Sequence, residues 1–253
     1  MKKLLLLIIA LLLVSPNIFP QDTGDYKLIT VKEGETLNII VSKYLRNKRF
    51  KLDLLRYNHL KANQIKAGIN LKIPYSISKD RVARVKFFKG TVDKSLDDVT
   101  WTPIRQVASI LLQKHHVRTA KDAKIEIQFD NGSIIQILDE SIASLEEYSY
   151  TKSGVNFNLK RGSLFANVRK LRKRSTFSIS TVTAVVGVRG TEFYVNIDEN
   201  DKVKVEVYKG KVNVMAKNQL VVVKRGYETT VSKDSAPLKP SKIKVSRTIQ
   251  WSK

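Results

Sequence analysis

The sequence predicts a small α+β domain followed by a larger antiparallel all-β domain. Apolar residues recur at helical spacing from Leu37 to Tyr44, whereas the segments 124–129 and 202–208 alternate strictly between polar and apolar residues. Long helical stripes are missing from the second part of the chain. With 253 residues, of which 42% are hydrophobic, the chain is long enough to bury a core in both domains.

The first 21 residues are typical of a secretory signal peptide. Two lysines precede the unbroken apolar run Leu4–Val14, and a polar, turn-forming stretch at 15–17 follows it. The apolar run rises about 16 Å as a helix, which is too short for the roughly 30 Å apolar core of a bilayer. The alternative is an uncleaved anchor whose apolar run continues past Pro16. We expect residues 1–21 to be removed and the mature chain to be exported to the periplasm or cell envelope.

The charge balance points to an anionic environment. There are 46 Lys and Arg residues against 23 Asp and Glu residues, a net charge of +23 that becomes +21 when Lys2 and Lys3 are lost. Outside the cytoplasm the anionic partners are peptidoglycan carboxylates, phosphate-bearing wall or lipopolysaccharide groups, and lipid headgroups. Nucleic acid is therefore not an expected partner. The absence of cysteine excludes disulfides, thiolate metal sites and cysteine nucleophiles.

The first domain is predicted over residues 26–75 as a β-α-α-β unit. Its apolar residues change from a strand pattern to a helical stripe and back again. The expected elements are a strand at Tyr26–Val31, a helix over 37–44 capped by Thr36, a second helix at Leu52–Tyr57, and a closing strand at Leu71–Pro74.

This domain resembles a lysin motif (LysM). The residues that carry the resemblance are ITVKEGETL at 29–37 and IKAGINLKIP at 65–74, with Ile40, Tyr44 and Asn58 between them. Two departures are Glu35, where the family usually has aspartate, and a longer, more basic link between the helices. The family folds as β-α-α-β and binds N-acetylglucosamine-containing glycans, chiefly peptidoglycan.

The resemblance implies a shallow glycan-binding groove between the turn before the first helix and the loop after the second. Backbone N–H and C=O groups and a few aliphatic side chains suit an acetamide group. By position, the predicted glycan-binding residues are Gly34, Glu35, Thr36 and Leu37 on one side and Ala62, Asn63, Gln64 and Ile65 on the other. The alternative for Thr36 is a pure helix cap, and for Leu37 and Ile65 a place in the core.

From residue 82 to 233 the pattern is that of an all-β domain. Asp130-Asn131-Gly132 joins the alternating segment 124–129 to a second apolar stretch at 133–137, which is typical of a β-hairpin. Lys209-Gly210 has the same place between two later strands. Further strands are predicted at 177–186, 192–197 and 220–223, so the regular short spacing favours an antiparallel sandwich or β-stack.

This second domain resembles the FecR-type extracytoplasmic domain. The motifs that carry the resemblance, in the family's order, are WTP at 101–103, VRT at 117–119, FDNGS at 129–133, LKRGSL at 159–164, TAVVGVRGTEF at 183–193 and VYKGKV at 207–212. The resemblance implies an all-β fold and a surface that binds a ligand or partner. The glycines expected around 108–114 are replaced, and we interpret Arg189 and Thr191 as supporting a tight turn at Gly190.

Classical members of that family join the domain through a membrane helix to a cytoplasmic anti-sigma segment. Neither is expected here, so the resemblance implies binding without the sensor function.

A basic segment lies within the β domain and could bind anionic wall polymers or lipid. Its seven cations are Lys160, Arg161, Arg169, Lys170, Arg172, Lys173 and Arg174. The alternative is a solvated loop between strands. The remaining residues, 234–253, form a Pro- and Lys-rich tail in which Trp251 either docks on the β domain or begins another module.

The sequence predicts no catalytic site, cofactor or metal. The three histidines are scattered, and the adjacent His115 and His116 would point to opposite faces of a strand. A G-x-S-x-G nucleophile motif and the cysteine and histidine of wall peptidases are missing. A glycosidase needs no local signature for its two acids, so a divergent wall hydrolase is an alternative.

Together these observations predict a non-enzymatic envelope protein. The LysM domain would bind peptidoglycan, and the FecR-like domain would present a surface to an envelope protein or polymer. The alternatives are an accessory of an envelope signalling receptor and a binder of membrane surfaces or lipopolysaccharide.

Overall fold

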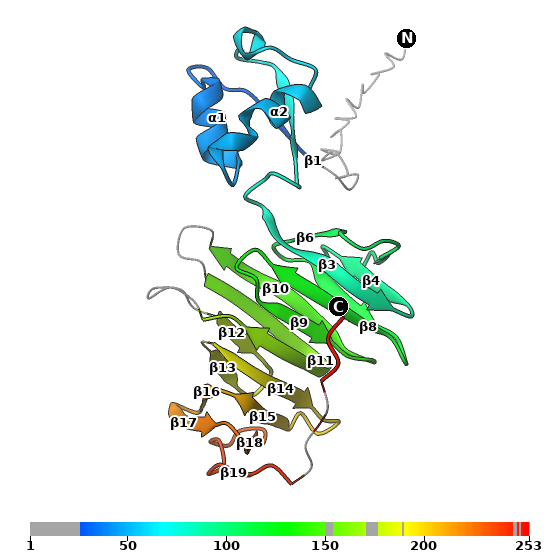
Figure 1. Cartoon of the computed structure of the whole chain (residues 1–253), viewed down its shortest axis with the longest axis vertical. Coiled ribbons are helices and arrows are strands. Elements are labelled where there is room, and N and C mark those ends of the chain that lie inside the picture. Colours follow the sequence, from blue (N-terminus) through cyan, green and yellow to red (C-terminus); the bar gives the residue numbers. More distant parts are fainter. Residues whose placement is uncertain are drawn as a thin grey trace, which may run out of the picture.

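The computed structural model describes residues 26–149, 154–170, 177–188, 190–244, 247 and 249–252. The predicted signal peptide lies outside these ranges. A small α+β domain, blue to cyan in Figure 1, is followed by a larger domain of strands. The predicted fold class, α+β followed by a largely antiparallel all-β domain, is confirmed. Within the described ranges, no helix is long and apolar enough to cross a membrane.

The N-terminal domain has the predicted β-α-α-β order. Its elements are β1 (Tyr26–Thr30), α1 (Leu37–Tyr44), the short 3-10 helix η1 (Lys48–Phe50), α2 (Lys51–Tyr57), the 3-10 helix η2 (Ala62–Gln64) and β2 (Asn70–Pro74). β1 and β2 pair antiparallel. The buried stripe of α1, formed by Leu37, Ile40 and Val41, packs in one apolar cluster with residues of α2 and β2.

Two polar side chains fix the ends of these helices. Thr36 caps α1 as predicted, because its hydroxyl accepts a hydrogen bond from the Ile39 N–H at 3.3 Å. Such a cap contributes about 1 kcal/mol. Asn58 ends α2 and joins it to β2, since its amide donates to the Lys72 carbonyl at 2.8 Å and accepts from the Lys72 N–H at 2.7 Å.

The β domain consists of two sheets that share one long strand, β11 (Gly154–Val168). The first sheet has the order β6 (Ile110–Leu112), β3 (Arg81–Lys89), β8 (Lys124–Phe129), β9 (Ile134–Ile137), β11, β14 (Thr191–Ile197), β15 (Val203–Lys209), β18 (Tyr227–Val231), β19 (Ser241–Lys242). The second has the order β5 (Thr102–Pro103), β4 (Val92–Ser95), β7 (His116–Thr119), β10 (Ile142–Ser149), β11, β12 (Phe177–Ser180), β13 (Val185–Val188), β16 (Lys211–Ala216), β17 (Gln219–Lys224).

One hydrophobic cluster draws side chains from both sheets. Its largest fully buried members are Phe129, Phe157, Phe177 and Phe193. Phe129 forms T-shaped pairs with Phe177 and with Phe157, with ring centroids 5.5 Å and 6.4 Å apart. Edge-to-face contacts of this kind add about 0.5–1.5 kcal/mol beyond area burial.

The β domain departs from the predicted strands in two places. The segment 177–186, predicted as one strand, is divided between β12 and β13 by a turn in which the Thr181 N–H donates to the Ala184 carbonyl at 2.9 Å. β12 also runs parallel to β11, whereas every other strand pair described is antiparallel.

Two non-glycine residues in turns have the left-handed backbone conformation that glycine adopts most easily. Ala108 has φ +65° and Lys114 has φ +68°, within the stretch where the FecR resemblance leads one to expect glycine. The left-handed conformation is therefore retained, and each residue bears the strain of its Cβ.

The tail after residue 234 returns to the first sheet, where Figure 1 draws its end in red beside β8 and β11. The Trp251 indole donates to Glu192 at 2.9 Å. The Ser252 N–H donates to the fully buried Glu126 at 2.7 Å, and Lys86 donates to the Ser252 carbonyl at 2.7 Å. Trp251 therefore docks on the β domain, which was one of the two alternatives.

Candidate functional sites

The first side of the predicted glycan groove is the turn before α1. Gly34 has φ +76°, and a Cβ built on it would meet nothing within 4 Å, so its backbone faces open space. The Glu35 carboxylate accepts from the Lys32 N–H and the Lys43 ammonium, both at 3.0 Å, and these two contacts hold its pKa below the usual value. Thr36 is exposed but caps α1, whereas Leu37 is buried. Structural contacts therefore occupy Glu35, Thr36 and Leu37, whereas Gly34 is exposed to solvent.

The second side is formed by η2 and the residue after it. Ala62 and Asn63 are exposed, and Ile65 is half-buried against the core. The Gln64 side chain accepts from the Lys61 N–H at 2.7 Å, which closes the turn. This side therefore consists of three exposed residues, two of which carry side-chain amides, and one half-buried aliphatic side chain.

A short backbone ladder holds the two sides of the predicted groove near one another. The Val31 N–H donates to the Ile69 carbonyl and the Gly68 N–H donates to the Val31 carbonyl, both at 2.9 Å. A cavity of about 490 Å³ on this domain shares none of the eight predicted residues. It is lined by Leu52, Leu55, Arg56, His59, Leu60 and Lys61.

The predicted basic segment is separated along β11. Lys160 donates to Asp98 at 2.7 Å, and this ammonium holds the pKa of the Asp98 carboxyl below its usual value. Arg161 is exposed next to it, whereas Arg169 and Lys170 follow the other end of the strand, up to roughly 26 Å away for eight extended residues. Arg172, Lys173 and Arg174 lie outside the described residues.

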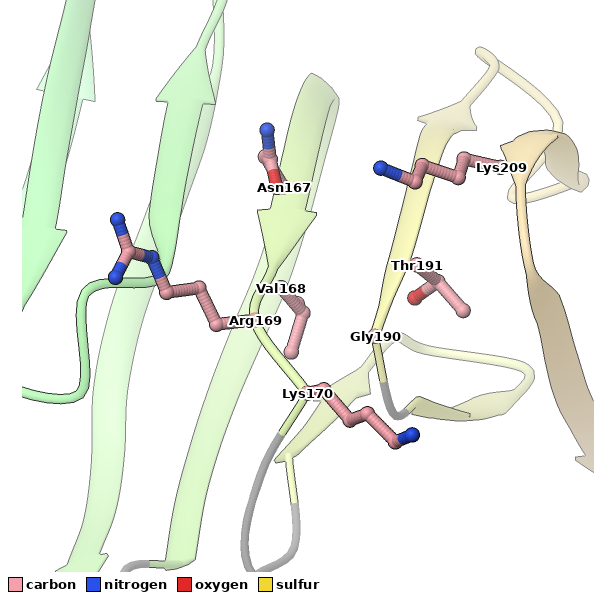
Figure 2. A pocket seen from close by; sticks show the side chains of 7 residues that line it. All are labelled: Asn167, Val168, Arg169, Lys170, Gly190, Thr191 and Lys209. Atoms are coloured by element: carbon pink, nitrogen blue, oxygen red, sulfur yellow. The ribbon is translucent and has the colours of Figure 1, made fainter.

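Arg169 and Lys170 instead belong to a cavity of about 680 Å³ (Figure 2). Its walls come from the end of β11, the start of β14 and the end of β15. The lining residues are Asn167, Val168, Arg169, Lys170, Gly190, Thr191 and Lys209. Sequence reasoning missed Asn167 and Lys209, and it gave Thr191 only a supporting role. Motif spacing could not find them, because about forty residues separate Arg169 from Lys209 in the chain.

A third feature is an apolar row at the edge of the second sheet, which we call the β17 edge surface. It consists of Val185, Met215, Leu220 and Val222, which are between 38% and 55% exposed. Val185 lies opposite Met215, and Met215 lies opposite Leu220, so three strands contribute to one row. Exposed apolar side chains on an edge strand are typical of an interaction surface.

The histidines do not converge on one site. His59 is exposed, His115 is buried, and His116 lies 3.5 Å from Asp98. Across the described ranges, no three or more His, Asp and Glu side chains gather in an arrangement that would hold a metal.

Comparison with family models identifies two domains in the predicted order. A LysM domain model matches residues 29–74, and the model described as "FecR protein" matches residues 115–213. The chain therefore contains a LysM domain followed by a FecR domain. Both are binding or signalling domains typical of cell-envelope proteins.

Among curated proteins, none matches the chain. Two crystal structures described as a "putative anti-sigma factor" from Parabacteroides distasonis ATCC 8503 resemble it with 18% identity and TM-scores of 0.44 and 0.43. Each match covers 50% of this chain, and the chain spans 59% of the length of those structures.

Proposed function

We propose that this chain is an exported, non-enzymatic envelope protein that binds peptidoglycan through its LysM domain and presents its FecR domain to a protein partner. The observation that carries the first half is the LysM match at 29–74, together with the exposure of residues at both sides of the predicted groove.

The groove residues suit an uncharged glycan. Gly34 has no side chain to cover its peptide groups, and η2 offers the exposed residues Ala62 and Asn63. Ile65 provides an aliphatic contact for the methyl group of an acetamide. A sugar polymer is recognised by such hydrogen-bonding groups and small apolar contacts, without a requirement for charge.

The net charge adds a second, less specific interaction. At +21 without Lys2 and Lys3, the exported protein is attracted to the carboxylates and phosphates of an anionic wall. This attraction is screened by salt over a Debye length of about 8–10 Å, whereas hydrogen bonding to an uncharged glycan is not. Salt therefore separates the two contributions.

The test is co-sedimentation of the mature protein with purified peptidoglycan sacculi across a salt series. Ala62→Trp places a bulky ring on the exposed second side of the groove. Gly34→Trp is a poorer choice, because φ +76° strains any larger residue. Ser42→Trp, at an exposed position of α1 outside the eight predicted residues, is the matched control.

We expect wild type and Ser42→Trp to sediment with sacculi even at high salt and Ala62→Trp to remain in solution. Binding that fades with salt equally in all three proteins would show that charge alone is responsible. Release of muropeptides from the sacculi would instead support a wall hydrolase.

Envelope signalling is the second candidate function, and the β17 edge surface favours it. Leu220 is 55% exposed on β17, which pairs with β16 alone among the described strands, and such an edge suits a protein partner better than a sugar. Leu220→Asp should leave sacculus binding intact while changing the transcript profile of cells that carry it in place of the wild type. An unchanged profile would count against this candidate.

A further inference from the structure

We propose that the cavity between the ends of β11, β14 and β15 is a binding site for a phosphate group. The proposal does not depend on the glycan-binding function, because the cavity lies in the FecR domain and shares no residue with the predicted groove. Figure 2 shows Lys170 and Lys209 on either side of Gly190 and Thr191, whereas the Arg169 side chain extends away from β14, towards the turn at Gly132.

The first argument is uncompensated positive charge. Arg169 and Lys170 line the cavity just after β11 and Lys209 lines it at the end of β15, and all three are exposed. In the part of the chain that the structure describes, none of them forms an ion pair with a carboxylate. Glu192 lies opposite Lys209 in the strand register, but its carboxylate accepts the Trp251 indole N–H at 2.9 Å.

The second argument is a buried hydroxyl without a partner. Thr191 is 2% exposed, and its Oγ1 has no hydrogen-bond partner among the described residues. Figure 2 draws this oxygen on the side of the Thr191 side chain that faces Val168 and Lys170. Leaving such a group unsatisfied is costly, so an acceptor oxygen in the cavity would complete its hydrogen bonding.

The third argument is that two glycines let the turn after β15 lie close to the start of β14. Gly190 and Gly210 have φ +67° and +78°. A Cβ on Gly210 would lie 2.8 Å from the Gly190 carbonyl oxygen and 2.9 Å from Thr191 Cγ2. Glycine at these positions lets the turn after β15 pack against the start of β14, and this brings Lys209 to the cavity that Thr191 lines.

These features match phosphate better than carboxylate. A carboxylate brings one negative charge to three cations, whereas a phosphate monoester brings about 1.5 to 2 and three acceptor oxygens. The Lys170 and Lys209 ammonium groups bind phosphate as point charges, and Arg169 adds positive charge at the margin of the cavity. A volume of about 680 Å³ is within the range of small-molecule sites, so the phosphate can be part of a larger molecule.

The test is calorimetric titration of the full-length mature protein with inorganic phosphate at constant ionic strength. Lys170→Gln, Lys209→Gln and Thr191→Val each remove one proposed contact. We expect each variant to bind about tenfold more weakly than wild type. Lys224→Gln removes the same charge from an exposed position of β17 outside the cavity and should bind within about twofold of wild type.

Thr191→Ser keeps the hydroxyl and should retain binding, which separates a lost contact from a local packing defect. The two lysines are exposed, so their variants remain folded and test the proposal even if Thr191→Val does not fold. Equal affinity in Lys170→Gln, Lys209→Gln and Lys224→Gln would overturn the proposal, since the binding would then reflect net charge.

A second arm identifies the source of the phosphate. Flotation with phosphatidic acid vesicles is compared with flotation with phosphatidylcholine vesicles. If the protein binds inorganic phosphate and both Lys170→Gln and Lys209→Gln weaken that binding, the result supports a soluble phosphate ligand. If the protein binds only phosphatidic acid vesicles and the same two variants weaken that binding, the result supports a lipid headgroup. Binding to neither probe overturns the site, whatever the result with sacculi.

Discussion

His115 lies immediately before β7 with 5% of its surface exposed, and its Nδ1 accepts the Leu112 N–H at 3.1 Å. Burial, together with the nearby charges of Lys94 and His116, lowers the pKa of this imidazole to about 3. The ordinary value is 6.5. Protonation would place a charge in the interior and remove the acceptor that Leu112 requires.

The folded state therefore favours neutral His115 more strongly than the unfolded state does. Its contribution to stability is complete above pH 6.5 and is lost progressively as the pH falls towards 3. We predict that the free energy of unfolding falls by up to about 1.4 kcal/mol per pH unit between pH 6 and pH 4 on account of this residue. Urea unfolding at each pH measures it.

His115→Gln keeps a hydrogen-bond acceptor that does not titrate, so its stability should depend less on pH in this range. His59→Gln, at an exposed position of the LysM domain, is the control and should retain the wild-type slope. If all three proteins have the same slope between pH 6 and pH 4, His115 is not the responsible group.

Gly162 illustrates what a single residue does for an element. Residues 154–161 of β11 pair with β10 in the second sheet, and from Gly162 onwards the strand pairs with β14 in the first. Gly162 has φ +82°, and a Cβ on it would lie 2.7 Å from Ser141 Cα. The Ser141 hydroxyl accepts the Ser163 N–H at 2.9 Å, which fixes the transition between the sheets.

We predict that Gly162→Ala lowers the free energy of unfolding by about 3 kcal/mol or more, because the new Cβ meets both a forbidden backbone conformation and the Ser141 backbone. Gly187→Ala in β13 is the control: φ is not positive there, and the nearest atom is 3.9 Å away. The two urea midpoints should differ clearly. Equal midpoints would mean that β11 can change sheets without a glycine.

Local sequence patterns predicted most of the helices and strands, but not that one strand belongs to two sheets. Alternation located β8 and β15, and helical spacing located α1 with its Thr36 cap, because each depends on residues close in sequence. The division between β12 and β13 was missed, since the intervening turn has no glycine or proline. No local signal indicates that β11 serves two sheets, because that depends on partners far along the chain.

At the scale of the whole molecule, the candidate sites differ in how far sequence could predict them. The eight glycan residues followed from a motif within one small domain, and their function stays a prediction. The phosphate cavity joins Arg169, Thr191 and Lys209 from three strands. Sequence reasoning noticed Arg169 and Lys170 as part of a charge run, but only the folded chain separates them from Lys160.

The two domains are joined by one carboxylate as well as by the chain. Asp130, in the turn between β8 and β9, lies 3.0 Å from the Arg46 guanidinium of the LysM domain and 2.6 Å from that of Arg81 in β3. All three side chains are less than 20% exposed. The linker beside them is held as well, since the Arg46 N–H donates to the Ile77 carbonyl at 3.1 Å.

Asp130→Asn should loosen this junction, because it removes the negative charge that the Arg46 and Arg81 guanidinium groups share, at a cost of about 2–4 kcal/mol. The linker at 75–80 contains Lys79, and Arg81 follows it at the start of β3. We therefore predict about tenfold faster tryptic cleavage at these two residues, measured by mass spectrometry of the fragments. Asp93→Asn breaks the more exposed pair with Arg118 and should leave the cleavage rate unchanged. Equal cleavage of Asp130→Asn and wild type would show that the covalent linker alone positions the LysM domain. Faster cleavage would instead mean that Asp130 limits how the LysM domain can turn relative to the FecR domain.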